Sequence, residues 1–536
     1  MTGAQAVVTS LEKEGVTTVF GYPGAAICPV YDCLAQSPIC HILVRQEQSA
    51  GHAAAAFGRI SGRPGVCIST SGPGALNLLT ALATAYMDSV PLVAITGQVS
   101  SELLGRDVFQ EADITGAAEP FTKHSFLVKN AADLPRIMKE AFYLASTGRQ
   151  GPVLIDLPVD VQNQQLDFVY PEEVSIRGYN PSTRANPLQL RRVAEAISSA
   201  RRPVICAGGG VFSSGARDRM RRFAENCQIP VVTTMMGLGL MPSDHPLYFG
   251  MLGSFGCSAA NYAIRHSDLL ILIGARAGDR AMGQPGVMEK RTRIVHIDID
   301  PAEIHKNMEA SIPLVADARL ALEQLLECCA PPDTGMWLAE LREKRGVGAF
   351  ATDRPGFINP HRLVAALSEG LDEDSIYVAD VGLNQLWSAR SARIKAGRFL
   401  TSGGMGTMGY ALPAAMGARL ASGAGQVVAV MGDGGFQMSM QELATLVQHD
   451  IPVKLVLFRN DCLGLVRQIQ REVYGGRYEA VELGGSPDFA ALAQVYGIRA
   501  MTISDNSEIE DAVRALLAAE KSFLLQCLVS PDEPAV

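Results

Sequence analysis

The chain has 536 residues, enough for about three domains with large hydrophobic cores. Hydrophobic residues make up 48% of the sequence and charged residues only 19%, a balance typical of a well-packed α/β enzyme. The net charge is −9 and no block of Lys and Arg occurs, so nucleic acid is not expected as the main partner.

The cysteines and the N-terminus bear on cellular location. The 11 cysteines are scattered without a CxxC pair, and Cys67, Cys206 and Cys527 fall inside apolar segments, as reduced core residues of a cytosolic protein do. The first residues form neither a signal peptide nor an Arg-rich transit segment, and 18 apolar residues never run unbroken. These features predict a cytoplasmic protein with no membrane span.

The first part of the chain alternates helical segments with short apolar ones. An amphipathic helix opens it, and buried strands that close in Gly, Pro or a polar residue are predicted at residues 16–24, 41–48, 64–74, 91–97 and 151–158. Such alternation predicts a doubly wound parallel sheet. Polar and proline-rich sequence from 162 to 187 then predicts a linker.

Two further runs of the same kind follow. The second has strands predicted at residues 203–210, 230–237, 268–276 and 293–301. Residues 330–360 predict another linker, within which residues 337–345 can form a helix. The third run has strands predicted at residues 375–382, 398–404, 426–435, 452–461 and 522–529. The predicted fold class is therefore α/β, with three doubly wound parallel-sheet domains at residues 1–165, 186–330 and 355–536.

The first and third runs share an internal echo. Residues 69–97 and 430–460 each place a glycine turn, one helix and then a proline that opens the next strand, at nearly equal spacing. Common α/β connectivity could produce this echo by itself. The echo nevertheless favours a duplicated architecture, in which two related sheets flank a third.

The third run carries a candidate ligand site. One predicted strand runs into Gly432, Asp433, Gly434 and Gly435, and the next ends at Asn460, 27 residues after Asp433. Because neighbouring parallel strands end on the same side, Asp433 and Asn460 could meet at the carboxyl edge of the sheet. Two oxygen donors beside a glycine turn suit a divalent cation that carries a phosphate. The spacing resembles the thiamin diphosphate motif, although a GDG segment alone can be an ordinary tight turn.

A second candidate is Glu47, which follows a predicted strand and precedes an alanine-rich helix. Thiamin chemistry needs a carboxyl group against the pyrimidine ring of the cofactor. A carboxyl at the end of a buried strand suits that task, because desolvation favours its protonated form. Alone, Glu47 could be an acid placed at a helix N-terminus by the dipole. Together with Asp433 and Asn460, it becomes the candidate for the pyrimidine contact.

Longer segments extend this pattern over nearly the whole chain. The segments are GYPGAAICPVYD at 21–32, RQEQSAGHAAAAFGRISGRPGV at 45–66, TSGPGALNLLTALATAYMDSVPLVAITGQV at 70–99, GRDVFQEADITG at 105–116, GRQGPVLIDLPVDVQ at 148–162, HIDIDPAEI at 296–304 and SGGMGTMGYALPAAMGA at 402–418. In order and with family spacing, they resemble the catalytic subunit of the acetolactate synthase (acetohydroxyacid synthase) family.

The resemblance implies an assignment for each domain and an assembly. Residues 1–165 would bind the thiamin pyrimidine, residues 186–330 would bind FAD, and residues 355–536 would bind the diphosphate and Mg²⁺. Active sites of the family lie between two subunits, so Glu47 of one chain would face Asp433 of another in a homodimer or homotetramer. A small regulatory subunit often accompanies the family.

The resemblance also implies the cofactor contacts. Mg²⁺ would be held by Asp433, Asn460 and the backbone carbonyl of Cys462. Gly406 and Met408 resemble positions that hold the pyrimidine and bend the cofactor, although Met408 could also be plain core packing. Further thiamin diphosphate positions are Pro73, Asn77, Gly382, Gly432, Gly434 and Gly435.

The implied reaction decarboxylates pyruvate on thiamin diphosphate and transfers the two-carbon unit to a second 2-keto acid. The product is 2-acetolactate, or 2-aceto-2-hydroxybutyrate when 2-oxobutanoate accepts, and the reaction is the first common step of branched-chain amino-acid biosynthesis. Arg280 is the best candidate for the acceptor carboxylate because a guanidinium fork matches it, although an arbitrary Arg is usually a surface ion pair. The matching positions that line the site are Gly24, Phe109, Gln110, Lys123 and Arg280.

FAD is implied by the central domain, where it is structural in this family. Glycine turns at strand ends, with an acid for a ribose, make physical sense of that role but are common to Rossmann-like domains. The matching positions are Gly208, Gly209, Gly210, Gly250, Gly253, Gly274, Arg276, Asp298, Ile299, Asp317 and Ala318.

The chain departs from the family pattern close to the implied site. GQHQ has become GLNQ at residues 382–385, YPGG has become YPGA at 22–25, and RFDDR has become RAGDR at 276–280. The Trp of VRQWQ, associated with preference for 2-oxobutanoate, is Ile469. Loss of an indole removes a large flat apolar contact. We therefore expect pyruvate to be the preferred acceptor, or selectivity to be weak.

Two alternative functions stay open at the level of sequence. Another thiamin diphosphate-dependent carboligase or decarboxylase, such as a sulfoacetaldehyde acetyltransferase or a benzoylformate-type decarboxylase, fits the altered acceptor pocket. An inactive paralogue that acts as a binding or regulatory subunit is suggested by Leu383 and Asn384. The intact Glu47, Asp433 and Asn460 oppose that second alternative.

Overall fold

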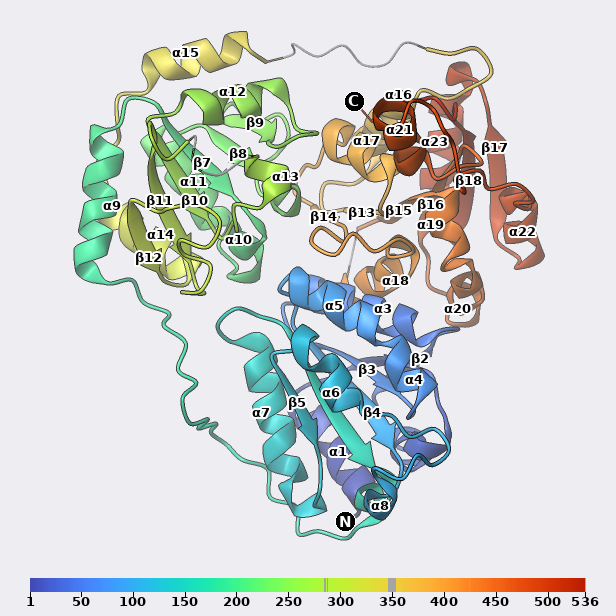
Figure 1. Ribbon diagram of the computed structural model, residues 1–536. Coiled ribbons are helices and arrows are strands. Elements are labelled where there is room, and N and C mark those ends of the chain that lie inside the picture. Colours follow the sequence, from blue (N-terminus) through green and yellow to red (C-terminus); the bar gives the residue numbers. More distant parts are fainter. Residues whose placement is uncertain (284–285, 287, 346–352, 424, 536) are drawn as a thin grey trace.

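The computed structural model describes residues 1–283, 286, 288–345, 353–423 and 425–535. It contains three six-stranded sheets, every strand pair of which is parallel, and each sheet is flanked by helices (Figure 1). The N-terminal domain lies at the bottom of Figure 1, the central domain at the upper left and the C-terminal domain at the upper right. The predicted class of three doubly wound parallel α/β units is confirmed.

The N-terminal sheet has the strand order β2-β1-β3-β4-β6-β5. Its strands are β1 (Thr18–Gly21), β2 (Cys40–Leu43), β3 (Gly65–Ser69), β4 (Leu92–Gln98), β5 (His124–Leu127) and β6 (Pro152–Pro158). The helices of this part are α1 (Gly3–Lys13), α2 (Cys28–Leu34), α3 (Glu47–Ser61), α4 (Pro73–Asn77), α5 (Leu79–Met87), α6 (Ile114–Ala118), α7 (Leu134–Ser146) and α8 (Val159–Asn163).

The central sheet has the order β12-β11-β10-β7-β8-β9, in which the direction of winding reverses between β7 and β10. Its strands are β7 (Pro203–Ala207), β8 (Val231–Thr233), β9 (Tyr248–Met251), β10 (Leu269–Ile273), β11 (Arg293–Asp298) and β12 (Ile312–Val315). The helices are α9 (Pro187–Ser199), α10 (Gly209–Ser213), α11 (Arg217–Cys227), α12 (Ser258–His266), α13 (Asp279–Met282), α14 (Ala318–Cys328) and α15 (Gly335–Glu343).

The C-terminal sheet repeats the topology of the N-terminal one, with the order β14-β13-β15-β16-β18-β17. Its strands are β13 (Ile376–Ala379), β14 (Arg398–Leu400), β15 (Val427–Gly432), β16 (Lys454–Arg459), β17 (Arg499–Ile503) and β18 (Phe523–Leu528). The helices are α16 (Pro360–Gly370), α17 (Leu383–Ser391), α18 (Ala411–Ala421), α19 (Asp433–Gln437), α20 (Leu443–Gln448), α21 (Gly464–Val473), α22 (Phe489–Val495) and α23 (Ile509–Ala518). The shared order supports the duplicated architecture that the internal echo favours.

Among the described residues, four strands were not predicted from the sequence, and all four lie at sheet edges. They are β5, β9, β12 and β17, whereas the inner strands β3, β4, β6, β7 and β10 are buried along their whole length. A parallel strand covered on both faces gives an unbroken apolar run that a sequence reveals. An edge strand such as β17, with an exposed Arg499, does not.

The N-terminal and C-terminal domains share one hydrophobic core. Helices α3 and α18 pack against each other, and a side chain at Gly417 of α18 would collide with the backbone carbonyl of Ala53 in α3. Buried residues of both domains, including Leu82 and Leu412, belong to a single cluster. This contact fixes the orientation of α3, whose first residue is Glu47.

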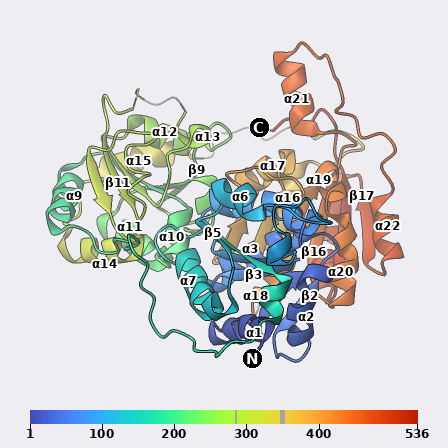
Figure 2. The same cartoon turned by 60° about the horizontal axis from the view of Figure 1, so that its bottom comes forward.

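The segments between the sheets agree with the predicted linkers in part. Residues 164–186 contain neither helix nor strand, and helix α15 covers most of the helix predicted at 337–345. Residues 346–352 of the second predicted linker, and Val536 at the end of the third predicted domain, lie outside the described residues. Helix α21 stands away from the rest of its domain (Figure 2). In the described part of the chain, no helix has the length and apolar character needed to cross a membrane.

Candidate active site and cofactor cleft

The turn after β15 buries the Asp433 carboxylate at the start of α19, where the side chain is surrounded by backbone amides. Its Oδ1 accepts a hydrogen bond from the amide of Gly434 at 2.9 Å. Its Oδ2 accepts from the amides of Asn460 at 3.0 Å and Asp461 at 2.6 Å. The two strand ends therefore meet, as their spacing predicts. Burial raises the pKa of Asp433 to about 6, because the amide hydrogen bonds only partly offset the cost of desolvation.

The loop after β16 holds the other two predicted metal positions. The side-chain Oδ1 of Asn460 accepts from the amide of Cys462 at 3.2 Å, and Cys462 is buried. Asp461 adopts a left-handed conformation with φ 53°, which folds the loop back over Asp433. Within the described ranges, no group of three or more His, Cys, Asp or Glu side chains forms a metal site. A carboxylate, an amide oxygen and a backbone carbonyl instead offer the oxygen ligands that a hard divalent cation prefers.

The glycines Gly434 and Gly435 beside Asp433 lie too close to neighbouring atoms to carry a side chain. A Cβ on Gly434 would lie 2.9 Å from Leu463 and 3.4 Å from the methyl group of Met408. A Cβ on Gly435 would lie 2.8 Å from a carboxylate oxygen of Asp380. Gly432 precedes them at the end of β15. The arrangement forms a cradle of bare backbone, with Met408 against one side.

The altered segment at 382–385 faces this cradle. Asn384 is buried, and its Nδ2 donates to the carbonyls of Asp380 at 2.8 Å and Val430 at 3.2 Å. Its Oδ1 lies 3.1 Å and 3.4 Å from where a Cβ on Gly382 or Gly432 would stand. Asn384 therefore ties α17 to β13 and β15 and presents an acceptor to the cradle. Gly406, with φ 66°, lies in the exposed part of the loop before Met408.

In the N-terminal domain, Glu47 gathers with other predicted residues around the turn at 70–74. Its Oε2 accepts from Nδ2 of Asn77 in α4 at 2.9 Å, and its Oε1 lies 3.2 Å from where a Cβ on Gly74 would stand. A Cβ on Gly24 would lie 2.6 Å from the Thr70 side chain. Pro73 opens α4 in the same turn.

Gln110 packs on the same turn, since a Cβ on Gly72 would lie 2.8 Å from its carbonyl oxygen. Gly72 has φ 57° and Gln110 has φ 59°, so both occupy the left-handed region. The neighbouring Phe109 is 87% exposed. Glu47, Gly24, Pro73, Asn77 and Gln110 are therefore brought together, and Phe109 projects beside them into solvent.

The two acids are thus held by separate parts of the fold. Glu47 is hydrogen-bonded within the N-terminal domain, and Asp433 within the C-terminal domain. Exposed apolar side chains occur in both domains, and Phe109 is one in the N-terminal domain. Those of the C-terminal domain include Met438, Val466, Ile469 and Val473, which are 46% to 68% exposed.

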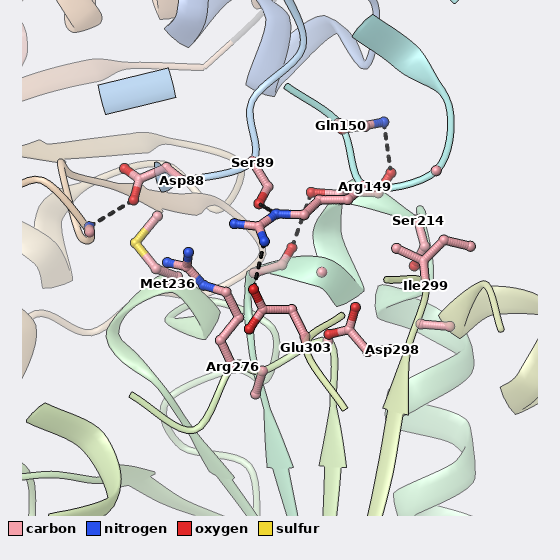
Figure 3. Close-up of a pocket in the computed structure, with 18 of the residues that line it drawn as sticks. Asp88, Ser89, Arg149, Gln150, Ser214, Met236, Arg276, Asp298, Ile299 and Glu303 are labelled. Carbon is pink, nitrogen blue, oxygen red and sulfur yellow. Dashed lines mark hydrogen bonds and ion pairs between the residues drawn. The ribbon is translucent and has the colours of Figure 1, made fainter. Parts of the chain in front are cut away.

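A cleft of about 1010 Å³ lies where the three domains meet (Figure 3). Most of its lining comes from the carboxyl edge of the central sheet at the reversal between β7 and β10, where open α/β sheets bind ligands. At this edge Gly210 and Gly274 touch, since a Cβ on Gly210 would lie 2.7 Å from the Cα of Gly274. The predicted FAD positions that line the cleft are Gly209, Gly210, Gly274, Arg276, Asp298, Ile299, Asp317 and Ala318.

Three predicted FAD positions do not line the cleft. Gly208 packs under the turn after β10, and its amide donates to the carbonyl of Ile273 at 3.0 Å. Gly250 lines a different cavity, and Gly253 packs against the backbone of Arg280. Inside the cleft, burial raises the pKa of Asp298 to about 6.

Several polar residues of this cleft were not predicted from the sequence. Arg149 of the N-terminal domain donates through Nε to Ser89 at 2.9 Å and through NH1 to Glu303 at 2.6 Å (Figure 3). Glu303 is buried, and its Oε2 has no hydrogen-bond partner among the described residues. The carboxylate of Asp88, whose side chain is 1% exposed, accepts from the amide of Gly404 at 2.8 Å. The residues of this junction come from three domains, and no local pattern connects them.

Lys123 and Arg280 do not join either group of predicted active-site residues. The Nζ of Lys123 donates to the carbonyls of Leu144 and Thr147 and to the hydroxyl of Tyr179, so it caps the end of α7. Burial lowers the pKa of Lys123 to about 8. Arg280, with a side chain 84% exposed, stands at the mouth of the cleft near Asp279. Their roles toward substrate stay predictions.

Known domain models match this fold and this site in order. The thiamine pyrophosphate enzyme N-terminal TPP binding domain matches residues 1–117, the central domain matches residues 190–325, and the C-terminal TPP binding domain matches residues 380–527. Thiamine pyrophosphate is another name for thiamin diphosphate. These matches define the class as thiamine pyrophosphate enzymes, which bind the cofactor that the GDG pattern predicts.

Comparison with individual curated proteins shows which family within this class the chain belongs to. The chain is 46% identical to a probable acetolactate synthase large subunit of Methanocaldococcus jannaschii, over 99% of this chain and 93% of that protein. It is 45% identical to the acetolactate synthase large subunit of Corynebacterium glutamicum, over 99% and 87%. It is 42% identical to an acetolactate synthase of Arthrospira platensis, over 99% and 95%. The chain belongs to the acetolactate synthase large-subunit family, which confirms the resemblance.

Proposed function

We propose that this chain catalyses the synthesis of 2-acetolactate from two molecules of pyruvate with thiamin diphosphate as cofactor. The observation that carries the proposal is the meeting of Asp433 and Asn460 beside a side-chain-free turn at the edge of the C-terminal sheet. The acetolactate synthase names of relatives that align with almost the whole chain support the product. These matches favour the synthase over another thiamin enzyme or an inactive paralogue.

When bound, the thiazolium ring serves as the electron sink for loss of carbon dioxide. The protein contributes a carboxyl group at Glu47 that exchanges a proton with the pyrimidine ring. Asn77 holds one oxygen of that carboxyl, and Gly24 and Gln110 shape the turn around it. Met408 packs on the glycine turn and would orient the cofactor from the other side.

Asp433, Asn460 and the carbonyl of Cys462 would hold Mg²⁺, which would neutralise the diphosphate charge. The fit is chemical, because all three offer oxygen and the buried Asp433 carboxylate has no cationic partner among the described residues that would offset its desolvation. Gly432, Gly434, Gly435 and Gly382 would let the diphosphate approach the backbone. These ligand assignments are part of the proposal.

We propose further that the active site is completed between subunits of a homodimer or homotetramer. Glu47 of one copy would face Asp433 of the second copy, which accounts for the apolar side chains exposed in both domains. Two relatives carry the name "large subunit", which supports a small regulatory subunit as an additional partner.

FAD is the proposed occupant of the cleft at the domain junction. The cleft lies at the reversal of strand order, and its volume of about 1010 Å³ is large enough for a dinucleotide. Asp298 would accept from a ribose hydroxyl, and Arg276 would face the diphosphate. Glu303 presents an unpartnered buried oxygen to the same region.

The acceptor 2-keto acid would be chosen by residues at the exposed rim. Arg280 would bind its carboxylate, with Phe109 and Lys123 nearby in the assembled protein, and Ile469 would contact its side chain.

We assign the pyrimidine, FAD and diphosphate functions to residues 1–165, 186–330 and 355–536. A cytoplasmic location is proposed because all 11 cysteines are free thiols.

The deciding experiment is a pyruvate assay on the purified protein with and without thiamin diphosphate, Mg²⁺ and FAD. Acetolactate that forms only with thiamin diphosphate, and that disappears after chelation of the metal, would support the proposal. Acetaldehyde as the main product would point to a decarboxylase. No Mg²⁺-dependent binding of thiamin diphosphate in calorimetry would support the inactive paralogue.

A further inference from the structure

Glu442 is a fully buried acid at the contact between the N-terminal and C-terminal domains. It ends the short 3-10 helix Met440–Glu442 that precedes α20, and its exposed fraction is 0%. Both carboxylate oxygens accept from the backbone amide of Arg45, at 3.0 Å and 3.1 Å. Oε2 also accepts from Oγ1 of Thr445 at 2.6 Å. The hydroxyl of Ser49 provides a further hydrogen bond.

The partners of Glu442 in the N-terminal domain flank Glu47. Arg45 lies two residues before Glu47, and Ser49 lies two residues after it. The same contact continues at β2, where the amide of Leu43 donates to Nε2 of His449 at 3.1 Å. The C-terminal domain therefore grips the strand-to-helix turn that presents Glu47.

A carboxylate suits this place for a simple reason of hydrogen-bond chemistry. The amide of Arg45 and the hydroxyls of Thr445 and Ser49 all act as donors toward Glu442. An ionised carboxylate only accepts, whereas the amide of Gln would turn an NH₂ group toward one of these donors. Burying a charge costs free energy unless the charge is hydrogen-bonded. Because every donor at this place points toward the carboxylate, the site favours Glu over Gln.

We propose that Glu442 is a positioning residue for Glu47. It holds the backbone amide of Arg45 before Glu47 and the side chain of Ser49 after it, so that the Glu47 carboxyl keeps its direction toward the pyrimidine ring, while Asn77 holds the carboxyl itself. The inference rests on the proposed function of Glu47. It assigns Glu442 no contact with substrate or cofactor.

The first test uses the protein without any cofactor. Glu442→Gln is expected to speed hydrogen–deuterium exchange of the Arg45 amide by roughly tenfold, the equivalent of one lost hydrogen bond. Gln448→Ala is the matched control, because Gln448 accepts from the Arg45 guanidinium at 2.6 Å across the same contact but leaves the backbone amide untouched. Equal exchange in Glu442→Gln and the wild-type protein would overturn the inference.

The second test follows exchange of the proton on the thiazolium carbon of bound thiamin diphosphate. Glu442→Gln is expected to slow it roughly 10- to 100-fold, as small misplacements of a reacting group do, with little change in cofactor affinity. In a Glu47→Gln background the same substitution should add nothing, because Glu442 acts through Glu47. Additive effects would indicate a merely structural role and would overturn the inference.

The outcomes separate this inference from the proposed function. If Glu47→Gln itself leaves thiazolium exchange unchanged, the role of Glu47 is wrong. If Glu47→Gln slows exchange and Glu442→Gln does not, only the positioning role is wrong. Should Glu442→Gln fail to fold, Thr445→Val removes one of the donors to the carboxylate and should shift both readouts in the same direction by a smaller factor.

Discussion

Single residues decide what this site can do, and its two acids are placed in different ways. Asp433 is buried among backbone amides, which leaves a charge that a cation would offset. Glu47 is half-buried and is bonded to one side chain, Asn77. A metal ligand needs a fixed charge, whereas a proton-exchanging carboxyl needs access to the group it serves.

The role of Glu47 can be tested by removing its proton while keeping its shape. Glu47→Gln should bind thiamin diphosphate about as well as the wild-type protein, yet slow exchange at the thiazolium carbon by roughly 10²- to 10⁴-fold. Asn77→Ala, which removes only the supporting hydrogen bond, should give an intermediate rate. Unchanged exchange in Glu47→Gln, measured by quenched-flow NMR, would refute the role.

Ile469, which is 46% exposed on α21, is the residue that we expect to govern the choice of acceptor. We expect mainly 2-acetolactate when pyruvate and 2-oxobutanoate compete at equal concentrations. Ile469→Trp should raise the share of 2-aceto-2-hydroxybutyrate by roughly three- to tenfold, because an indole restores a flat apolar contact. Val473→Trp, one turn further along the same face, is the control. A wild-type protein that yields mainly 2-aceto-2-hydroxybutyrate would contradict the expectation.

At the scale of elements, the burial of a strand determined whether that strand could be predicted from the sequence. The strands that the sequence predicted include every inner strand of the three sheets, where apolar residues face helices on both sides. The four missed strands pair on one side only, and β5 and β17 carry exposed or half-buried residues along most of their length. Their extended form is set by the neighbouring strand, which no local pattern records.

The turns after β7 and β10 are the elements on which the proposed flavin site depends. Gly210→Ala would place a methyl group 2.7 Å from the Cα of Gly274, so the two turns must move apart. We expect a protein that is purified without flavin and is destabilised by about 1–3 kcal/mol. Absorbance spectra and thermal unfolding measure the two effects. Gly335→Ala, where the nearest atom is 3.9 Å away, should change neither.

At the scale of the whole molecule, the first and third sheets along the chain have the same topology, and the sheet between them in sequence has a different strand order. The duplicated sheets place Glu47 on one and Asp433 on the other, and both domains carry exposed apolar side chains, among them Phe109 and Met438. A symmetric dimer would bury both surfaces at once and form two equivalent sites.

Shared sites can be demonstrated by mixing two inactive chains. A mixed dimer of Glu47→Gln and Asp433→Asn would contain one doubly altered site and one intact site, if the sites form between chains. Random association should then restore about a quarter of the wild-type activity, since half of the dimers are mixed and each keeps one of two sites. Sites contained within single chains would give no activity in the mixture. Either substitution alone supplies the baseline.

The sequence by itself determined the α/β class, the inner strands, the echo between the first and third runs, and the pairing of Asp433 with Asn460. These follow from local patterns, because apolar runs, glycine turns and the alternation of helices and strands are recorded in short stretches of chain. The contacts of Lys123, the cleft contributed by Arg149, Glu303 and Asp88, and the grip of Glu442 on the turn at Glu47 were decided only by tertiary structure. They join residues from different elements or domains, and long-range contacts of this kind depend on how the domains pack.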